Sequence, residues 1–212
     1  MSTAMPTPEP AGVPPVKLAD TVTGVHPLIR SRWSPRSFSS REVSAHDLRT
    51  LLEAARWAAS SYNEQPWRFL VATKSDPAAY QKMLNILVEF NQQWARTAPV
   101  LILTVAKKHF THNNAPNHHA LHDTGAALAN LMLQAVSMGI YAHGMAGYDH
   151  ERARKELNIP DDYELGAAVA LGYPAPAEQL PESFRQGETA PRARKPLDQI
   201  VFGAGWNQPA KL

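Results

Sequence analysis

The sequence contains no cysteine, which excludes disulfides, thiolate catalysis, iron–sulfur ligation and cysteine-based zinc sites. Long hydrophobic runs are also missing: residues 98–106 form one of the longest apolar stretches, about half of what a membrane helix requires. We therefore predict no membrane span and, without a signal-peptide core, a cytoplasmic location. An excess of one charge is missing too, because 21 basic residues face 19 acidic ones. A net charge of +2 does not suit a general nucleic-acid binder, which needs many phosphate contacts.

Glycine is scarce relative to proline, with 11 glycines against 18 prolines. Several of the prolines lie among the first fifteen residues, which predicts a flexible, extended arm over residues 1–20. Residues 21–212 are long enough for one domain with a single core, and no second linker interrupts them. Residues 190–212 lack a partner element nearby in the sequence. We expect them to form a C-terminal arm that packs on another surface.

Hydrophobic periodicity predicts a mixed α and β domain with three layers. Ser44 is placed to cap the first helix, and Gly139 is placed to end a long helix that is almost free of charge. Because that helix is apolar on nearly every side, we expect it to be buried on most faces and to offer a dimer interface. The predicted helices cover residues 45–60, 76–88, 125–138 and 150–157, and the predicted strands cover residues 67–73, 100–105 and 166–171.

Positive charge gathers near the start of the domain. Between residues 21 and 41 there is no acidic residue, and serines are interleaved with four arginines, Arg30, Arg32, Arg36 and Arg41. Guanidinium groups and hydroxyls suit a phosphate monoester. A second basic group occupies residues 192–195, and the two groups could converge on one phosphate. The alternative interpretation is a solvated basic surface.

A second polar segment, Ala-Ser-Ser-Tyr-Asn-Glu-Gln-Pro-Trp at residues 59–67, lies between a predicted helix and a predicted strand. It places several hydrogen-bonding side chains in one turn, and proline fixes its exit. Taken alone, the serines and the asparagine could be local turn formers and Trp67 a core residue. Together with the arginine and serine segment, it indicates a binding site.

Four motifs in this order resemble those of the nitroreductase family of flavoproteins. Residues 32–38, Arg-Trp-Ser-Pro-Arg-Ser-Phe, resemble its Arg-Arg-Ser-x-Arg-aromatic motif, and residues 59–67 resemble its Pro-Ser-Ser-x-Asn-x-Gln-Pro-Trp motif. Residues 139–149 resemble its third motif, in which a glycine after the long helix leads to a short strand and then to Gly-aromatic-Asp, here within Ala-Gly-Tyr-Asp at residues 146–149. Residues 192–196 resemble its Lys-x-Arg-x-Pro motif. The resemblance covers residues 28 to about 201, nearly the whole domain.

The resemblance implies an α+β, three-layer fold with a mixed, mostly antiparallel sheet flanked by helices and a C-terminal arm, 190–212, exchanged with the partner subunit. It also implies a homodimer that holds flavin mononucleotide (FMN) at its interface. The implied contacts are Arg32, the Trp33 backbone, Ser34 and Arg36 for the phosphate and ribityl end, Arg192 and Arg194 for the phosphate, Gly147 and, more loosely, Asn91 for the ring, and Ala59, Ser60, Ser61 and Asn63 from the other subunit.

Three positions depart from the family pattern. Trp33 replaces an arginine, which removes one charge contact, and Ala146 stands where several members have glutamate, which removes a side chain that could tune the flavin. Ala59 in place of proline is a minor change.

The function that the resemblance implies is an FMN-dependent oxidoreductase. Electrons pass from NADH or NADPH through flavin N5 to nitroaromatic, quinone or related small acceptors by a ping-pong route. The bound flavin carries the redox chemistry, so no side chain of the protein is expected to act as acid, base or nucleophile. The sequence does not choose between NADH and NADPH and does not name the acceptor.

A histidine-rich segment supports a rival interpretation, a non-catalytic flavin or metal-binding protein. Five of the nine histidines fall between His109 and His122, and a helical His118 and His122 would share a face that could ligate a metal. Only one carboxylate lies nearby, so we predict no metal site and interpret the segment as a mobile polar loop beside the substrate pocket. Three aromatic residues could line that pocket or belong to the core, with core favoured for the second: Phe90, Trp94 and Phe110.

Overall fold

A computed structural model describes residues 13–21 and 23–211 of the chain. Its sheet has four strands in the order β1-β2-β4-β3, and all three pairings are antiparallel. The predicted α+β class is confirmed, although the sheet of the described residues is wholly antiparallel rather than mixed. The strands are β1 (Trp67–Thr73), β2 (Val100–Lys107), β3 (Tyr141–Met145) and β4 (Tyr163–Gly172), so the three predicted strands are present and two of them are longer than expected.

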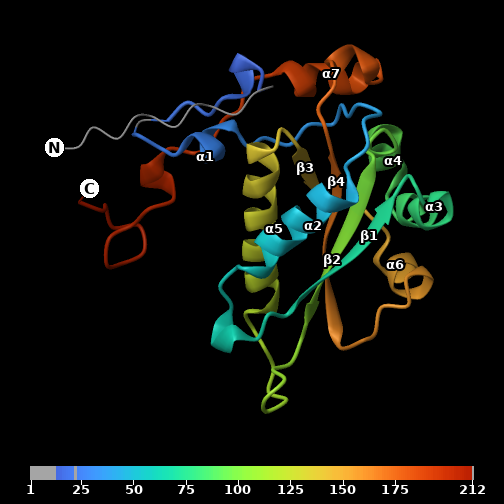
Figure 1. Cartoon of the computed structure of the whole chain (residues 1–212). Helices are drawn as coiled ribbons and strands as arrows, with labels where there is room; N and C mark the ends of the chain where they lie inside the picture. Colours follow the sequence, from blue (N-terminus) through green and yellow to red (C-terminus); the bar gives the residue numbers. More distant parts are fainter. Residues whose placement is uncertain (1–12, 22, 212) are drawn as a thin grey trace.

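Helices cover both faces of the sheet and give the predicted three layers (Figure 1). Two helices cover one face, and three shorter helices lie on the other; α1 and α7 lie beside the upper end of the sheet in this view. The first pair is α2 (Ala45–Arg56) and α5 (Ala120–Ser137), the other three are α3 (Pro77–Asn85), α4 (Glu89–Ala95) and α6 (His150–Glu156), and the remaining two are α1 (Pro27–Ser31) and α7 (Glu182–Thr189).

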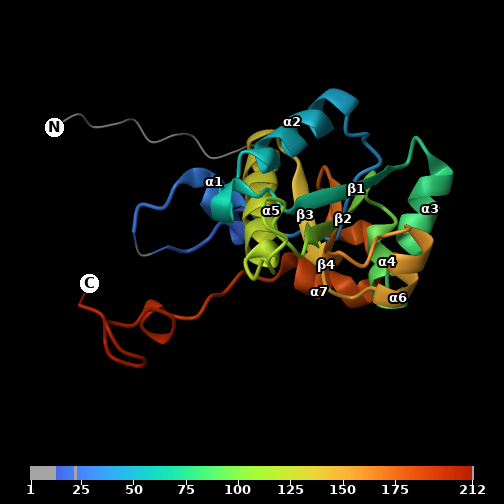
Figure 2. The same cartoon turned by 90° about the horizontal axis from the view of Figure 1, so that it is seen from below.

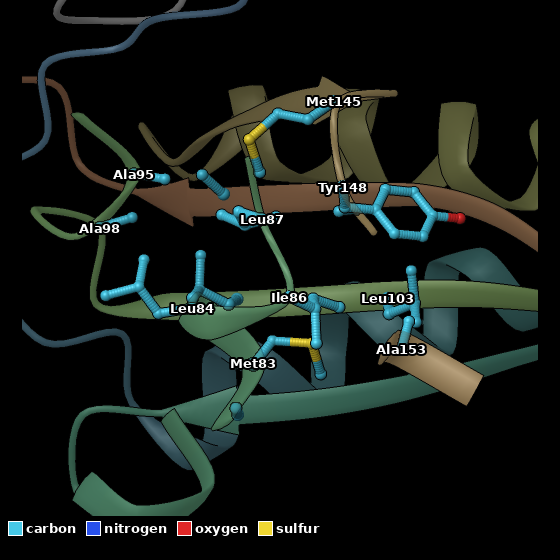
Figure 3. Packing of buried hydrophobic residues seen from close by; sticks show 14 of the residues in the cluster. Met83, Leu84, Ile86, Leu87, Ala95, Ala98, Leu103, Met145, Tyr148 and Ala153 are labelled. Atoms are coloured by element: carbon cyan, nitrogen blue, oxygen red, sulfur yellow. The ribbon is translucent and has the colours of Figure 1, made fainter. Parts of the chain in front are cut away.

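Strand β2 shows how the sequence builds these layers. Successive side chains of a strand point to opposite faces. Accordingly, Leu101 and Leu103 belong to the cluster under α3 and α4, whereas Val100 and Ile102 belong to the cluster under α2 and α5. Figure 3 shows Leu103 among the buried side chains of the first cluster. Both faces of β2 are therefore core, which explains its almost unbroken hydrophobic run.

The predicted helix over residues 76–88 is present as α3 but ends three residues early, at Asn85. A second helix that was not predicted, α4, begins at Glu89. Between them, the Ile86 carbonyl accepts from the Asp149 amide (2.8 Å), and the Val88 amide donates to the Gly147 carbonyl (3.1 Å). These hydrogen bonds to a distant segment replace the helical ones. They also fix residues 147–149 beside α4.

The other helices differ from prediction mainly at their ends. The Ser44 hydroxyl accepts from the Asp47 amide (3.0 Å), as expected for a cap, but α2 ends at Arg56 rather than near residue 60. Helix α5 begins at Ala120 and includes Gly125, where a side chain would meet open space. It ends before Gly139, whose φ of +69° suits glycine, as predicted.

Helix α5 is less enclosed than its composition predicts. Ala127, Leu131 and Ala135 are fully buried against α2 and the sheet. On the other side of the helix, Leu121 is 48% exposed. In a single chain, α5 thus has one buried face and one face that stays open. No helix among the described residues is long and apolar enough to cross a membrane.

The two terminal segments behave differently. Residues 1–12 of the arm predicted over residues 1–20 lie outside the described part, but from Val13 on the chain packs against the domain. Lys17 is only 4% exposed, and its ammonium group donates to the Ala190 carbonyl (2.5 Å). Residue 17 is therefore in contact with the segment that follows α7. By contrast, the C-terminal residues after 190 extend away from the sheet, with apolar side chains such as Leu197 and Trp206 exposed (Figure 2).

Candidate functional site

The arginine and serine segment, residues 21–41, includes α1, and the part after α1 packs on the C-terminal end of α5. Trp33 in this segment is buried and packs against Val136 and Tyr141, with 6.2 Å between the rings of Trp33 and Tyr141. Its indole serves the core, so at this position only the backbone can contact a ligand. On either side, the neighbouring Arg32 and Ser34 are half-buried, and the Arg32 guanidinium donates to the Ser34 hydroxyl (3.3 Å).

The structure brings the two basic groups together. The Arg192 guanidinium donates to the backbone carbonyl oxygens of Arg30 and Arg32. Burial lowers the pKa of Arg32, and the nearby charge of Arg194 lowers it further. Burial also lowers the pKa of Arg192, as do the charges of Arg32 and Arg194. The predicted convergence of the N-terminal and C-terminal arginines is therefore present in the fold.

Among the described residues, no ion pair within 4.0 Å joins Arg32, Arg192 or Arg194 to a carboxylate. The neighbouring Arg36 has a buried Nε atom without a hydrogen-bond partner. Partly buried cations that repel one another are costly unless an anion binds among them. The cluster thus fits a phosphate group.

The second polar segment forms a tight turn after α2. It includes a short 3-10 helix (Ser61–Asn63), and Tyr62, Asn63 and Gln65 have positive φ values of 52°, 54° and 51°. The Ser60 hydroxyl accepts from the Gln65 amide (3.0 Å), and the Ser61 amide donates to the buried carboxylate of Asp123 (2.9 Å). The turn is thereby fastened to the N-terminal end of α5, with Ala59 and Asn63 exposed.

The two predicted halves of the binding site lie far apart within one chain. The polar turn is fastened to Asp123 near the start of α5, whereas Trp33 packs on Val136 near its end. A separation of 13 residues along the helix corresponds to about 20 Å. Figure 1 shows α1 and the polar turn at opposite ends of α5. A single chain therefore does not bring these two halves together.

Gly147 lies in a close contact that only glycine permits. A Cβ atom at this position would lie 2.7 Å from Asn91 Nδ2. That side-chain nitrogen donates to the Gly147 carbonyl (2.9 Å), so the contact of Asn91 that the structure shows is with this loop. Among the described residues, the Gly147 amide has no backbone partner. This N–H is thus free to donate to a ligand, while the neighbouring Ala146 is exposed and offers no polar group.

The histidine-rich segment is a loop between β2 and α5. His109 contacts Asp162 (2.7 Å) and His122 contacts Asp123 (3.0 Å). His118 precedes the helix, so it does not share a helical face with His122. Among the residues that the structure describes, no group of three or more potential metal ligands is found.

The aromatic residues near the expected pocket have different environments. Trp94 is 1% exposed and belongs to the core, as favoured from the sequence. Phe90 is 59% exposed and lies against Phe184, with 4.9 Å between ring centres. Phe110 packs edge-on against Tyr62 of the polar turn, at 5.7 Å. The loop and the turn thus form one exposed aromatic corner.

Two side chains near the arginine segment, the buried Glu188 and the half-buried His143, were missed by sequence reasoning. Glu188 of α7 accepts hydrogen bonds from the backbone amides of Arg36 and Ser37, and His143 of β3 contacts the Pro35 carbonyl. Glu188 lies outside the four motifs, and His143 lies in the strand of the third motif, at a position to which the motif assigns no residue type. One surface depression of about 330 Å³ borders the histidine-rich loop and is lined in part by Lys108 and Asn117.

Clustered arginines that form no ion pair among the described residues are typical of sites for phosphorylated ligands. Residues 29–173 match the model of the nitroreductase family, and the chain belongs to that family. It is 38% identical over 224 aligned positions to the major NAD(P)H-flavin oxidoreductase of Aliivibrio fischeri, covering 83% of this chain and 98% of that protein. It is 28% identical over 202 positions to NADH dehydrogenase of Thermus thermophilus, and the alignment covers 81% of this chain and 91% of that protein. The crystal structure of an oxidoreductase containing FMN superposes on this chain with a TM-score of 0.84 and 35% sequence identity. The superposition covers 89% of this chain and 96% of that protein.

Proposed function

We propose that this protein is an FMN-dependent NAD(P)H oxidoreductase that acts as a cytoplasmic homodimer on nitroaromatic, quinone or related small acceptors. The observation that carries the proposal is the convergence of Arg32, Arg192 and Arg194 without a carboxylate partner. Family membership supports it, as do the FMN in the similar crystal structure and the flavin-linked name of the Aliivibrio relative.

The proposed roles of the residues follow from their positions. Arg32, Ser34 and Arg36 hold the phosphate and ribityl end from the N-terminal side, and Arg192 and Arg194 neutralise the phosphate from the C-terminal side. Each charge-assisted hydrogen bond of this kind contributes about 1.5 to 3 kcal/mol. The free Gly147 amide donates to the ring system. When bound, the flavin supplies the hydride and electron transfer, and the protein orients it and its substrates.

The dimer is part of the proposal because one chain holds only half of each site. Ala59, Ser60, Ser61 and Asn63 reach the flavin of the partner subunit, which overcomes the separation of about 20 Å along α5. The open face of α5 and the exposed apolar side chains of the C-terminal arm are the surfaces that the second copy covers. Burying such surfaces is the main favourable term in stable association.

We further propose that donor and acceptor use one pocket in turn, which gives ping-pong kinetics. The exposed corner formed by Tyr62 and Phe110 suits planar, aromatic acceptors, because aromatic rings pack well against one another. The protein itself holds no group that has to accept or donate a proton in the reaction.

Flavin analysis of the purified protein tests the proposal. We expect a yellow protein that releases FMN on denaturation, loses its colour with NADH or NADPH under anaerobic conditions, and regains it on addition of an acceptor. Parallel lines in double-reciprocal plots would establish the ping-pong order. A colourless protein that does not take up added FMN would overturn the proposal. If that protein bound zinc, the rival metal-binding function would replace it.

A further inference from the structure

The backbone of residues 34–37, which belong to the arginine and serine segment, is held from two sides by two polar side chains that were not among the predicted site residues, Glu188 and His143. Glu188 holds its amides, and His143 holds one of its carbonyls. Both come from parts of the chain more than 100 residues away. This arrangement is more elaborate than a surface loop requires.

Glu188 lies in the last turn of α7 and is only 5% exposed. The Arg36 amide donates to both of its carboxylate oxygens (3.0 Å each), and the Ser37 amide donates to Oε1 (3.0 Å). Lys17 lies close enough for its charge to interact with Glu188, and its ammonium group is fixed on the Ala190 carbonyl. A buried carboxylate with these partners holds the backbone firmly, because hydrogen bonds to an ionised acceptor are stronger than neutral ones.

His143 holds the other side of the segment. Its Nδ1 atom lies 3.0 Å from the Pro35 carbonyl oxygen, and its ring packs on Trp94 with 4.6 Å between ring centres. Burial lowers the pKa of His143 to about 4, so the ring is neutral at neutral pH and donates one N–H to the carbonyl. Glu188 and His143 together leave the side chains of the segment, rather than its backbone, to contact a ligand.

We propose that Glu188 and His143 are positioning residues that hold residues 34–37 in the phosphate-binding conformation before flavin arrives, and thereby set the preference for FMN over riboflavin. This inference rests on the proposed function. Preorganisation strengthens binding because the cost of ordering the segment is met during folding rather than during association. Riboflavin lacks the phosphate that the segment contacts, so its binding gains little from this order.

The proposal predicts an effect opposite to that of simple electrostatics. A carboxylate near a phosphate site repels the phosphate, so removing its charge by Glu188→Gln would strengthen FMN binding if charge alone mattered. If Glu188 positions the segment, the same change weakens FMN binding, because the glutamine amide group turns a donor toward a backbone donor. The sign of the change therefore separates the two roles.

The test compares the FMN and riboflavin affinities of flavin-free wild-type and E188Q proteins by fluorescence titration. We expect the Kd for FMN to rise by about 10-fold or more in E188Q, since a buried backbone donor loses part of its acceptor. The Kd for riboflavin should change by less than about 3-fold. The matched control is E182Q, which removes an exposed carboxylate from the first turn of the same helix and should leave both affinities unchanged.

Equal or tighter FMN binding by a folded E188Q protein overturns the positioning role while leaving the proposed function intact. Failure of the wild-type protein to bind either flavin overturns the proposed function instead. If E188Q does not fold, hydrogen exchange of the wild-type protein decides. The amides of Arg36 and Ser37 should be protected in the flavin-free state, and rapid exchange there would show that no preset segment exists.

Discussion

The guanidinium group of Arg192 donates a hydrogen bond to the backbone carbonyl of Arg32, 160 residues earlier in the chain. This contact fastens the start of the C-terminal arm to the segment that begins the predicted phosphate site. The charges of Arg32 and Arg194 are thereby held close to each other without a carboxylate between them.

Removing two of the clustered charges should abolish tight flavin binding. We expect an R32A/R36A double variant to fold but to bind FMN at least about 100-fold more weakly, since each lost charge-assisted contact costs about 1.5 to 3 kcal/mol. Flavin content after purification and FMN titration measure the effect. The control is R49A, which removes an exposed arginine of α2. Undiminished flavin content in the double variant would mean that the phosphate binds elsewhere.

Gly147→Ala should destabilise the fold by displacing Asn91. The new Cβ atom lies 2.7 Å from Asn91 Nδ2, so either the side chain or the loop has to move. We expect a loss of about 1–3 kcal/mol in the free energy of unfolding, measured by urea denaturation. Because Asn91 is the obstacle, a G147A/N91A variant should be less destabilised than the two single changes predict. Strict additivity in this double-mutant cycle would contradict the contact.

The buried histidine predicts an acid-sensitive fold. The pKa of His143 is lowered to about 4, so the unfolded chain binds a proton more readily than the folded protein does. The neutral ring of His143 therefore adds to the free energy of unfolding. This contribution is complete above the histidine pKa of the unfolded chain, near 6.5, and is lost as the pH falls toward 4. Relative to H143N, the wild-type free energy of unfolding should fall by about 3 kcal/mol across this range. Parallel pH profiles of the two proteins would rule out a buried neutral imidazole.

Subunit mixing tests whether each flavin site is shared. R32A/R36A removes side chains of the segment that lies beside one end of α5, and S60A/N63A removes side chains of the polar turn beside its other end. Refolded together in equal amounts, the two inactive variants should form heterodimers with one intact site, which restores about one quarter of the wild-type flavin content. The control is each variant refolded alone. If the mixture is as empty as its components, both halves of the site come from the same chain.

Local sequence patterns predicted the parts of the fold that local physics determines. A continuous hydrophobic run identified β2, the Ser44 hydroxyl identified the start of α2, and Gly139 identified the end of α5. The end of α3 and the presence of α4 escaped prediction because hydrogen bonds to residues 147–149 replace helical ones between the two helices. Nothing in the sequence near Ile86 or Val88 signals those distant partners.

In the candidate site, too, local sequence predicted some features, whereas contacts between distant residues determine others. Arginines without acidic neighbours in the sequence predicted the arginine cluster, because like charges are retained together when they have an anion to bind. Glu188 escaped prediction, since its role depends on amides 151 and 152 residues away. In the sequence it is one more polar residue of a short, polar helix. Only the tertiary structure shows that its carboxylate is buried.

The length of α5 has a consequence for the working enzyme under the proposed dimer. Since this helix keeps the two halves of the site about 20 Å apart, the number of complete sites obeys mass action and depends on the concentration of subunits. Specific activity should then decline on dilution even while every chain remains folded. In the cell, total activity would then rise faster than in direct proportion to the concentration of the protein.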